Sequence, residues 1–482
     1  MSDDHTSQAW GIYGGVLADH VRNENIKRLA NEGMVLDNVF CTNSICVPSR
    51  ASILTGQYSH KNGVYTLSDS LHTSTPTIAG ALQKTGYETA IIGKWHLKAQ
   101  PGGFDHWEVL PGQGRYQNPI LRTRENWSEG GKTYDGFSAD VITDLSLDWL
   151  KDRNSEEPFF LMTHFKATHE PFDYPERLEH LYDGVEFPEP ESLYDFSPET
   201  NGRTFLGQKL WILGERWVNA SRNKDYSRYP GLPFDLEGLD SIAARKKIYQ
   251  KFVRDFLRSG AAIDENIGRI LDYLDEAGLA ENTVVIYTAD QGYFLGEHGM
   301  FDKRMMYEEA LRMPFVIRYP PEIKAGTRSD DMILNIDFPA LFADYAGMVK
   351  PDFVDGNSFR KNLRREQDAN RRKEMYYRYW LHRAERPAHF GVRSERYKLI
   401  YFYGQPLQAT GAMASTTEPG WEFYDLQEDP YELHNAYYDD RYQAVIDSLT
   451  EALVHLREEL GDTDAEDEMM QSVLPEALST AP

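Results

Sequence analysis

Hydrophobic and polar positions alternate along the first 165 residues in a way that predicts helices and strands in turn. Apolar residues recur with helical spacing in three segments, and two of these are followed by a short, continuous apolar run that predicts a buried strand. The expected helices are 25–33, 75–86 and 137–150, and the expected strands are 87–92 and 158–163. This alternation predicts an α/β fold with a large, mostly parallel central sheet covered by helices on both faces.

The pattern changes between residues 171 and 240, which are rich in Pro, Tyr, Trp and Asp and show little periodicity. We expect an irregular excursion there, of the kind that often shapes a binding cleft. Regular spacing resumes with expected helices at 243–277, 332–346 and 442–460 and expected strands at 283–288, 390–393 and 397–401. The short strands near the end predict a smaller antiparallel α+β subdomain.

These patterns divide the chain into an α/β catalytic domain over residues 1–370 and a C-terminal α+β subdomain over residues 371–482. The acidic tail after Gly461 is expected to be solvated or frayed.

The composition is that of a globular protein, with 41% hydrophobic and 26% charged residues and no apolar run long enough to span a membrane. A net charge of −25 argues against nucleic acid and anionic membranes as partners, because binding to them depends on Lys and Arg. The only cysteines are Cys41 and Cys46, so a disulfide framework is excluded as the main source of stability. The polar residues directly after Met1 do not fit a signal peptide.

The most informative string runs from Cys46 to Gly56 and reads Cys-Val-Pro-Ser-Arg-Ala-Ser-Ile-Leu-Thr-Gly. A lone cysteine is ordinarily a small buried apolar residue. Here Cys-X-Pro-Ser-Arg is followed by Leu-Thr-Gly at the spacing of the sulfatase signature. The chain therefore resembles the formylglycine-dependent sulfatases of the alkaline-phosphatase-like superfamily, and the resemblance implies their fold and the hydrolysis of a sulfate ester.

In the resembled family a maturation enzyme, formylglycine-generating or sulfatase-maturing, oxidises this cysteine to formylglycine, and we expect the same of Cys46. The hydrated aldehyde is a gem-diol. One of its hydroxyls attacks sulfur, and the other allows collapse to the aldehyde with release of sulfate, which divides the reaction into two easier steps. Arg50 resembles the arginine that hydrogen-bonds the diol.

Carboxylates from two distant parts of the chain form a candidate cation site. Asp290 comes directly after the expected strand 283–288, and ligand sites of open α/β sheets lie beyond the carboxyl ends of strands. With Asp3, Asp4 and the amide of Gln291 it offers an all-oxygen ligand set, which favours Ca²⁺, with Mg²⁺ as the alternative, over Zn²⁺. The resemblance implies that the cation also binds the formylglycine oxygen and the sulfate. Many family members carry Asn or His where this chain has Gln291.

Lysine and histidine side chains occur in three further segments that match the family in register. The first segment contains Lys94 and His96, the second contains His169 and the third contains Lys303. The resemblance implies that Lys94 and Lys303 bind the sulfate oxygens, as in oxyanion stabilisation. His169, with an ordinary pKa of about 6.5, is expected to donate a proton to the leaving alkoxide with help from Lys303. His96 is expected to accept the diol proton. His169 is preferred to His164, because His169-Glu-Pro171 matches the family's His-X-Pro and His164 is assigned to the strand.

The resemblance runs from residue 2 to about 460. The strings at 290–299 and 110–119 look most like bacterial sulfatases that act on sulfated glycans, including glucosamine-6-sulfatase-like enzymes. The expected substrate is therefore a sulfated sugar or polysaccharide. Candidate contacts to the sugar are Gln113, Tyr116, Asn118 and His298, although each also suits a structural role in its loop.

One departure concerns the start of the chain, because family members begin with an apolar strand that ends at the Asp-Asp pair. Here Met1 stands in place of that strand. Without it, Asp3 and Asp4 are expected to hang from a free terminus, which would threaten cation binding. A trimmed first strand, together with a lost signal peptide, is the other interpretation. The family implies a periplasmic or secreted protein.

Two alternative functions stay open. A phosphodiesterase or phosphonate monoester hydrolase of the same superfamily can use formylglycine and similar metal ligands, but the glycan-sulfatase-like string at 290–299 argues against it. A non-catalytic sulfoglycan-binding pseudoenzyme would not need the complete set of site residues that this chain contains.

Overall fold

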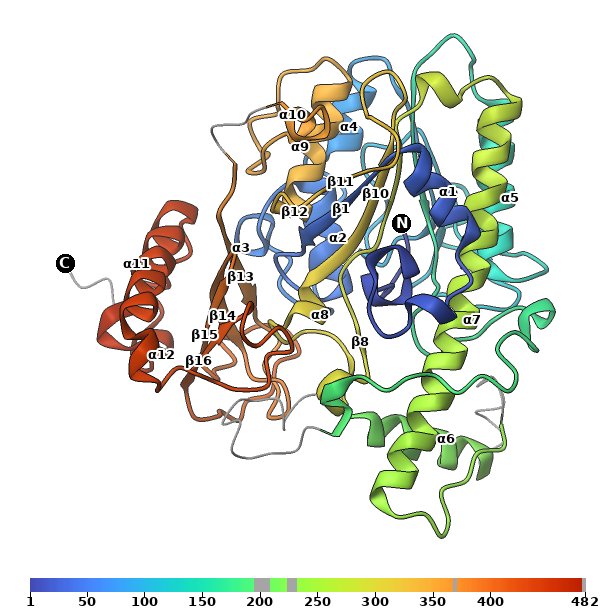
Figure 1. The fold of residues 1–482 in the computed structure, drawn as a ribbon. Coiled ribbons are helices and arrows are strands. Elements are labelled where there is room, and N and C mark those ends of the chain that lie inside the picture. Colours follow the sequence, from blue (N-terminus) through green and yellow to red (C-terminus); the bar gives the residue numbers. More distant parts are fainter. Residues whose placement is uncertain (195–208, 223–231, 367–370, 479–482) are drawn as a thin grey trace.

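The computed structural model describes residues 1–194, 209–222, 232–366 and 371–478. Most of the chain surrounds a central sheet built in two halves (Figure 1). One half has the order β11-β1-β10-β7 with β12 beside β1, and the other has the order β3-β2-β6. The strands are β1 (Met34–Phe40), β2 (Glu88–Lys94), β3 (His106–Leu110), β6 (Phe159–His164), β7 (Val285–Thr288), β10 (Arg312–Arg318), β11 (Thr327–Ser329) and β12 (Ile333–Leu334).

The sheet is mostly parallel, as the sequence predicts. Strand β2 runs parallel to β3 and β6, and β1 runs parallel to β11 and β12. Strand β10 is the exception, because it runs antiparallel to both of its neighbours, β1 and β7.

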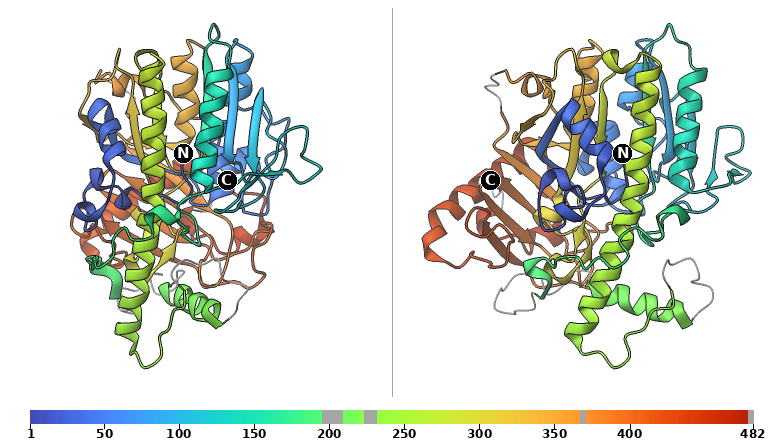
Figure 2. Two further views of the ribbon diagram at one scale, coloured as in Figure 1. Left: turned by 90° about the vertical axis from the view of Figure 1, so that its right-hand side faces the viewer. Right: turned by 45° about the vertical axis from the view of Figure 1, so that its right-hand side comes forward.

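Helices cover both faces of the sheet, and α5 and α7 lie side by side along one of them (Figure 2). Successive strand residues point to opposite faces. Leu36 and Phe315 pack into the core with α2 and α9, whereas Val35 and Val316 pack into the core with α1, α5 and α7. The helices are α1 (Glu24–Glu32), α2 (Cys46–Thr55), α4 (Ile78–Gln83), α5 (Ser138–Asp152), α7 (Ser241–Glu276) and α9 (Phe338–Tyr345). Among the described residues, no helix has the length and apolar character needed to cross a membrane.

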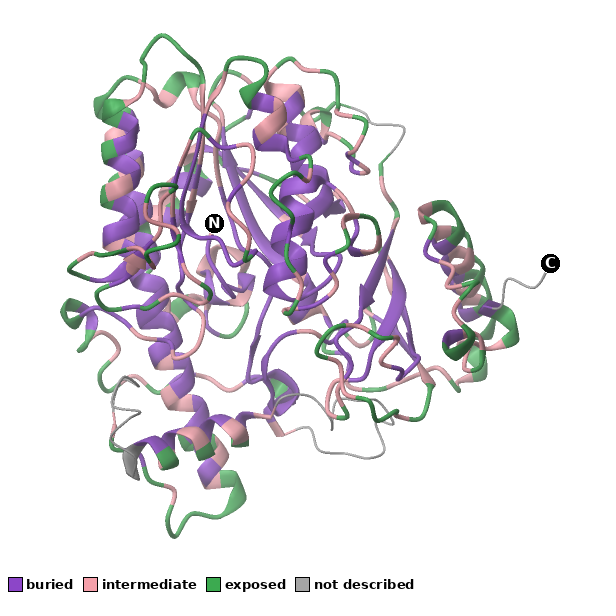
Figure 3. Ribbon diagram, turned by 180° about the vertical axis from the view of Figure 1, so that it is seen from behind, coloured by how far each residue is buried: buried purple, intermediate pink, exposed green. Residues whose placement is uncertain are grey.

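A second sheet, wholly antiparallel, has the order β13-β14-β15-β16 and is covered by α11. Figure 3 shows α11 with exposed residues along its outer side. This confirms the expected antiparallel α+β part. The proposed domain boundary at residue 370 lies outside the described residues and stays a prediction. The elements are β13 (Glu374–Tyr379), β14 (His389–Ser394), β15 (Tyr397–Phe402), β16 (Gly420–Asp425) and α11 (Gln443–Leu460).

Three local predictions were wrong. The segment 171–240, expected to be irregular, contains α6 (Leu210–Arg222), whose Leu213 and Trp217 share an apolar core with α7, while its residues 195–208 and 223–231 lie outside the described residues. The helix expected at 332–346 is the short strand β12, a 3-10 turn and α9. The tail after Gly461 is not solvated throughout, since Asp462 is buried and accepts a hydrogen bond from the Tyr376 hydroxyl at 2.7 Å.

Shorter elements connect the main ones. They are α3 (Ser59–Asn62), α8 (Glu308–Leu311), α10 (Arg360–Leu363), α12 (Glu468–Gln471), β4 (Ile120–Leu121), β5 (Lys132–Thr133), β8 (Phe294–Leu295) and β9 (Phe301–Asp302).

The start of the chain joins the two halves of the central sheet. The Met1 amino group donates to the Thr163 carbonyl at 2.8 Å, and the Ser2 amide donates to the Thr288 carbonyl at 3.0 Å. Ser2 forms a parallel β-bridge with Ala289, just beyond β7, and Asp3 forms one with Thr168, beyond β6. Asp3 and Asp4 are 0% and 1% exposed. The expectation that they would hang from a free terminus is wrong, because backbone pairing on both sides holds them.

Upstream of these bridges, β6 and β7 leave a cavity of about 660 Å³ between them. Met1 lies at this cavity, together with strand residues such as Leu161 and Ile286 and helix residues such as Leu271 and Phe342. Strands β6 and β7 are not paired with each other among the described residues. Their facing edges therefore offer backbone groups that one further strand could pair with.

An apolar segment of about six residues fused ahead of Met1 is expected to enter this cavity as a parallel strand. Burial of its side chains should raise the melting temperature by roughly 5 °C or more, measured by circular dichroism. A Gly-Ser segment of equal length is the control, because it can bury little apolar surface. Equal melting temperatures for the two fusions would contradict this prediction.

Candidate active site

Cys46 is the first residue of α2, in the chain that follows β1. Pro48 lies in the first turn of α2, where its missing N–H costs no helical hydrogen bond, and Gly56 ends the helix with a φ of 68°. A side chain at Gly56 would collide with Val354, because an added Cβ would lie 2.7 Å from Cγ1 of that valine. The signature residues therefore build a short helix whose N-terminus presents Cys46.

The Cys46 thiol is 1% exposed, and burial raises its pKa to about 12 even though the nearby Lys303 lowers it. A thiol with that pKa is protonated at neutral pH and is a poor nucleophile. Burial therefore disfavours the thiolate form of Cys46 in the cation-free protein.

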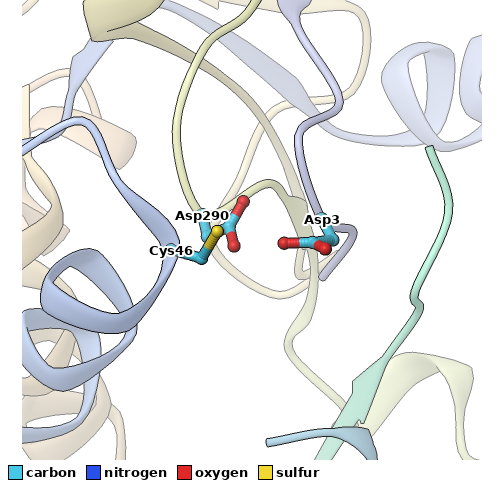
Figure 4. Close-up of side chains that lie close together, drawn as sticks. All are labelled: Asp3, Cys46 and Asp290. Carbon is cyan, nitrogen blue, oxygen red and sulfur yellow. The ribbon is translucent and has the colours of Figure 1, made fainter. Parts of the chain in front are cut away.

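Two carboxylates lie beside this sulfur. Ligand atoms of Asp3, Cys46 and Asp290 all lie within 4.8 Å of one another, and the same holds for Asp3, Asp4 and His169. Figure 4 shows Asp3 and Asp290 with their carboxylates beside the Cys46 sulfur. The three side chains come from the start of the chain, the end of β7 and the start of α2, so the fold brings together residues far apart in sequence.

Each of the three carboxylates has a buried cationic partner. The pairs are Lys94 with Asp3, Lys303 with Asp4, and Arg50 with Asp290, in which Nε and Oδ2 are 2.9 Å apart. The Arg50 guanidinium also donates to the Lys94 carbonyl at 2.7 Å. In this structure Arg50 thus holds Asp290 and the end of β2 in place, and its expected bond to a diol stays a prediction.

Despite these partners, the pKa values of two of the carboxylates are raised. Burial and the neighbouring Asp3 raise the pKa of Asp290 to about 7 despite Arg50. Burial also raises the pKa of Asp4 to about 6, although Lys303 opposes it. The side-chain amide of Gln291 donates to Asp4, and its Oε1 is buried without a hydrogen-bond partner among the described residues. Clustered carboxylates and an unsatisfied amide oxygen fit a hard divalent cation such as Ca²⁺ or Mg²⁺.

The imidazoles at the site are kept neutral. Burial and Lys94 lower the pKa of His96 to about 2, and the same two causes hold the pKa of His169 well below its ordinary value. His169 Nε2 lies 3.7 Å from Asp4 Oδ2, so this imidazole faces the carboxylate cluster. His164 is placed differently, since its Nδ1 lies 3.2 Å from the Lys94 carbonyl between β6 and β2. In the cation-free protein His169 therefore lacks the proton that its expected role requires, and the low pKa of His96 makes it a weak base, so both roles stay predictions.

The four candidate sugar contacts fall into two groups. Gln113 accepts a hydrogen bond from Lys94 Nζ at 2.5 Å, and the Tyr116 hydroxyl donates to the His169 carbonyl at 2.5 Å. These two lie against site residues. Asn118 accepts from the Gly136 amide at 3.0 Å, and His298 is 0% exposed, which suits structural roles. Contact of any of the four with a sugar stays a prediction.

The sequence patterns did not predict a role for two residues that lie at the site. The Ser49 hydroxyl donates to the Asp290 carbonyl and so ties α2 to the loop after β7. Lys166 is 3% exposed, and its Nζ lies 4.7 Å from the centre of the Tyr116 ring. The signal for Lys166 was its position two residues after β6, in the same strand-end segment that contains His169.

Comparison with known families gives two matches. The family described as Sulfatase matches residues 1–348, and the family described as N-sulphoglucosamine sulphohydrolase, C-terminal, matches residues 296–459.

Individual relatives cover nearly the whole chain. An N-acetylglucosamine-6-O-sulfatase of Bacteroides thetaiotaomicron is 36% identical over 97% of this chain and 87% of its own. An arylsulfatase of Clostridium perfringens is 25% identical over 94% of this chain and 92% of its own.

Solved structures agree with this placement. A protein solved in complex with its substrate D-glucosamine-2-N,6-O-disulfate superposes with a TM-score of 0.86 at 34% identity, over 97% of this chain and 98% of its own. A phosphonate monoester hydrolase from Silicibacter pomeroyi, with a TM-score of 0.72 at 22% identity over 96% and 95% of the two chains, shares the fold.

Proposed function

The chain belongs to the sulfatase family, and from that premise we propose that it removes the 6-O-sulfate of a glucosamine-type sugar through a formylglycine nucleophile and a divalent cation. The 36% identity to an N-acetylglucosamine-6-O-sulfatase, over 97% of the chain, supports the sugar. The proposed mechanism is supported mainly by the short distances between the ligand atoms of Cys46, Asp3 and Asp290. The buried Lys94 and Lys303 lie beside this group. The sulfatase activity follows from the family. The identity of the sugar, the formylglycine nucleophile and the divalent cation are what we propose.

The proposed nucleophile is formylglycine at position 46, produced from Cys46 by a maturation enzyme, and its hydrate supplies a hydroxyl that can attack sulfur. The high pKa of the unmodified thiol supports this proposal, because the buried cysteine itself would be a poor nucleophile. The position at the N-terminus of α2 also suits an oxygen that gains negative charge, since helix N-termini favour anions.

The proposed cation is held by Asp3, Asp4, Asp290 and Gln291, with Ca²⁺ favoured and Mg²⁺ as the alternative. Such an ion supplies positive charge to sulfate oxygens when it is bound. The residues themselves support its presence, because burial raises the pKa of Asp290 to about 7 and Gln291 Oε1 has no hydrogen-bond donor among the described residues.

The remaining roles follow from charge. Lys94 and Lys303 are placed to bind the sulfate oxygens, because each lies against a carboxylate of the cluster at Cys46. Neutral His96 is assigned to accept a proton. In the free protein Lys303 carries a proton, since Asp4 raises its pKa although burial alone would lower it. We therefore assign the proton for the leaving alkoxide to Lys303, or to His169 once an anionic sulfate beside it raises its pKa.

The test combines mass spectrometry with paired assays on converted protein. The tryptic peptide that contains Cys46 should show the mass of the aldehyde rather than that of the thiol. The same sample should hydrolyse N-acetylglucosamine 6-O-sulfate faster than 4-nitrophenyl sulfate or bis(4-nitrophenyl) phosphate. Faster turnover of the phosphodiester would replace this proposal with a phosphodiesterase function, and faster turnover of the aryl sulfate would remove the sugar from it.

Replacing Lys303 with methionine is expected to lower kcat by about 10²–10³-fold, the cost of losing one preorganised group that stabilises transition-state charge. The Lys303→Arg variant, which keeps the charge but not the shape, should lose less. The exposed Lys151, which pairs with Asp148 on α5, offers a control, because Lys151→Met should leave kcat unchanged. A Lys303→Met enzyme within fivefold of the parent kcat would exclude Lys303 from sulfate binding and proton donation.

A further inference from the structure

Lys166 is a buried cation that the proposed mechanism does not use. It follows β6 by two residues, and its side chain is 3% exposed. Lys94 and Lys303 each form an ion pair with an aspartate, whereas the described contacts give Lys166 an aromatic neighbour, Tyr116, and no ion pair. A buried ammonium without a carboxylate partner is costly, and such a cost is typical of a site that meets a ligand.

The surroundings of Lys166 show how unfavourable its charge is. Burial and the positive charge of Lys94 lower the pKa of the Lys166 ammonium to about 7, although Asp3 and Asp4 act in the opposite direction. Asp173 is close enough for Lys166 to lower its pKa, but the two do not form an ion pair. Lys166 therefore lies in a charged cluster without a carboxylate partner of its own, and an anion from outside would favour its protonated form.

Lys166 lies against the loop that contains Gln113 and Tyr116. Its Nζ lies over the ring of Tyr116, in the loop whose Gln113 contacts Lys94 and whose Tyr116 hydroxyl bonds the His169 carbonyl. This loop contacts the site at Lys94 and at His169. The carboxylate cluster already holds Lys94 and Lys303 for the sulfate that reacts, so Lys166 is available to a different anionic group.

We propose that Lys166 is a specificity-determining residue that binds a second anionic substituent, such as an N-linked sulfate, on the sugar that carries the reacting sulfate ester. This inference rests on the proposed function for the identity of the sugar. A charge-assisted hydrogen bond from a buried ammonium to a sulfate oxygen would stabilise that sugar over one with a neutral substituent. The Tyr116 ring under the ammonium would keep it in place without offering a competing negative charge.

The decisive measurement is binding rather than turnover. Calorimetric titration of Cys46→Ala protein in Ca²⁺ buffer with glucosamine 2-N,6-O-disulfate and with N-acetylglucosamine 6-O-sulfate gives a ratio of two dissociation constants. Adding Lys166→Met should weaken binding of the disulfate roughly tenfold and that of the acetylated sugar less than twofold, since only the disulfate offers the second anion. Lys166→Arg, which keeps the charge, should retain most of the preference.

Three results would overturn the assignment: equal weakening for both sugars, no weakening for either, or no binding of the disulfate by the Cys46→Ala protein. Thermal unfolding of Lys166→Met checks that the protein is folded, and methionine should be tolerated because the buried charge is removed. Turnover of N-acetylglucosamine 6-O-sulfate by converted protein is measured separately. Its absence would count against the proposed function, while the binding ratio would still decide the role of Lys166.

Discussion

Replacing Cys46 with alanine is expected to lower kcat for sulfate ester hydrolysis by about 10⁴-fold or more, as for removal of other enzymic nucleophiles. The substitution deletes the atom on which the proposed nucleophile is built, while Lys94, Lys303 and the carboxylates stay in place. Protein made without a maturation enzyme should be equally inactive, because burial raises the pKa of the unconverted thiol to about 12. Steady-state kinetics with N-acetylglucosamine 6-O-sulfate, alongside the mass of the Cys46 peptide, measures both effects.

Cys41 provides the matched control. It is the other buried cysteine of the chain, five residues earlier, and its sulfur lies 3.7 Å from the Ala310 carbonyl. Cys41→Ala should reduce stability modestly through a small cavity and leave the kcat of converted protein within a fewfold of the parent. If unconverted Cys46 protein were as active as converted protein, the formylglycine would have no part in the reaction.

The elements that could be predicted from the sequence are those with strong local signals. The expected helix at 243–277 is α7 at Ser241–Glu276, with Asp240 as its N-cap, and the expected helix at 442–460 is α11. Both carry a continuous apolar face and a clear start or stop. The apolar runs that became β6 and β7 were predictable for the same reason, since a strand of a sheet that is covered on both faces needs apolar residues on both.

Elements that depend on distant contacts could not be predicted. The apolar positions of α6 are interspersed with polar residues, and the helix is held by packing against α7, which follows it in sequence. The tail after Gly461 looks solvated from its acidic composition, yet Arg378 from β13 pairs with both Asp462 and Asp464. In each case the stabilising partner comes from another part of the chain, and no local pattern shows it.

The residues of the site also divide into those that local patterns predict and those that depend on distant contacts. The strand-end rule and the family motifs predict that Lys94, Asp290 and His169 lie close together. They did not show how Asp3 and Asp4 are held, because that depends on pairing of the first residues with both β6 and β7. Nor could they show that burial and Lys94 keep His169 neutral, since a pKa depends on surroundings that only the folded chain provides.

Replacing Asp290 with asparagine is expected to lower kcat/KM by about a thousandfold, roughly 4 kcal/mol, through loss of the bound cation. In the parent protein, Ca²⁺ at about a hundred times its Kd should stabilise the fold by roughly 3 kcal/mol. Asp290→Asn should lose most of this stabilisation. Thermal unfolding with Ca²⁺ and with a chelator measures it, and the same samples give the kinetics.

The pH dependence of the cation-free protein has a definite sign. Burial and Asp3 raise the folded-state pKa of Asp290 to about 7, above its value in the unfolded chain, so the folded state binds this proton more tightly. Stability without cation should therefore fall as pH rises from about 4 to about 7 and change little from this cause at higher pH. Ca²⁺ should act most strongly above pH 7, because the ionised carboxylate is its ligand.

Asp264 separates a cation effect from the general cost of a buried carboxylate. Burial raises its pKa to about 6, and it accepts hydrogen bonds from the Asn25 and Ile26 amides at the start of α1, away from the carboxylate cluster. Asp264→Asn should alter the pH dependence of stability but leave the Ca²⁺ stabilisation intact, whereas Asp290→Asn should change both. If Ca²⁺ stabilised Asp290→Asn as much as the parent, the cation would bind elsewhere and Asp290 would not be its ligand.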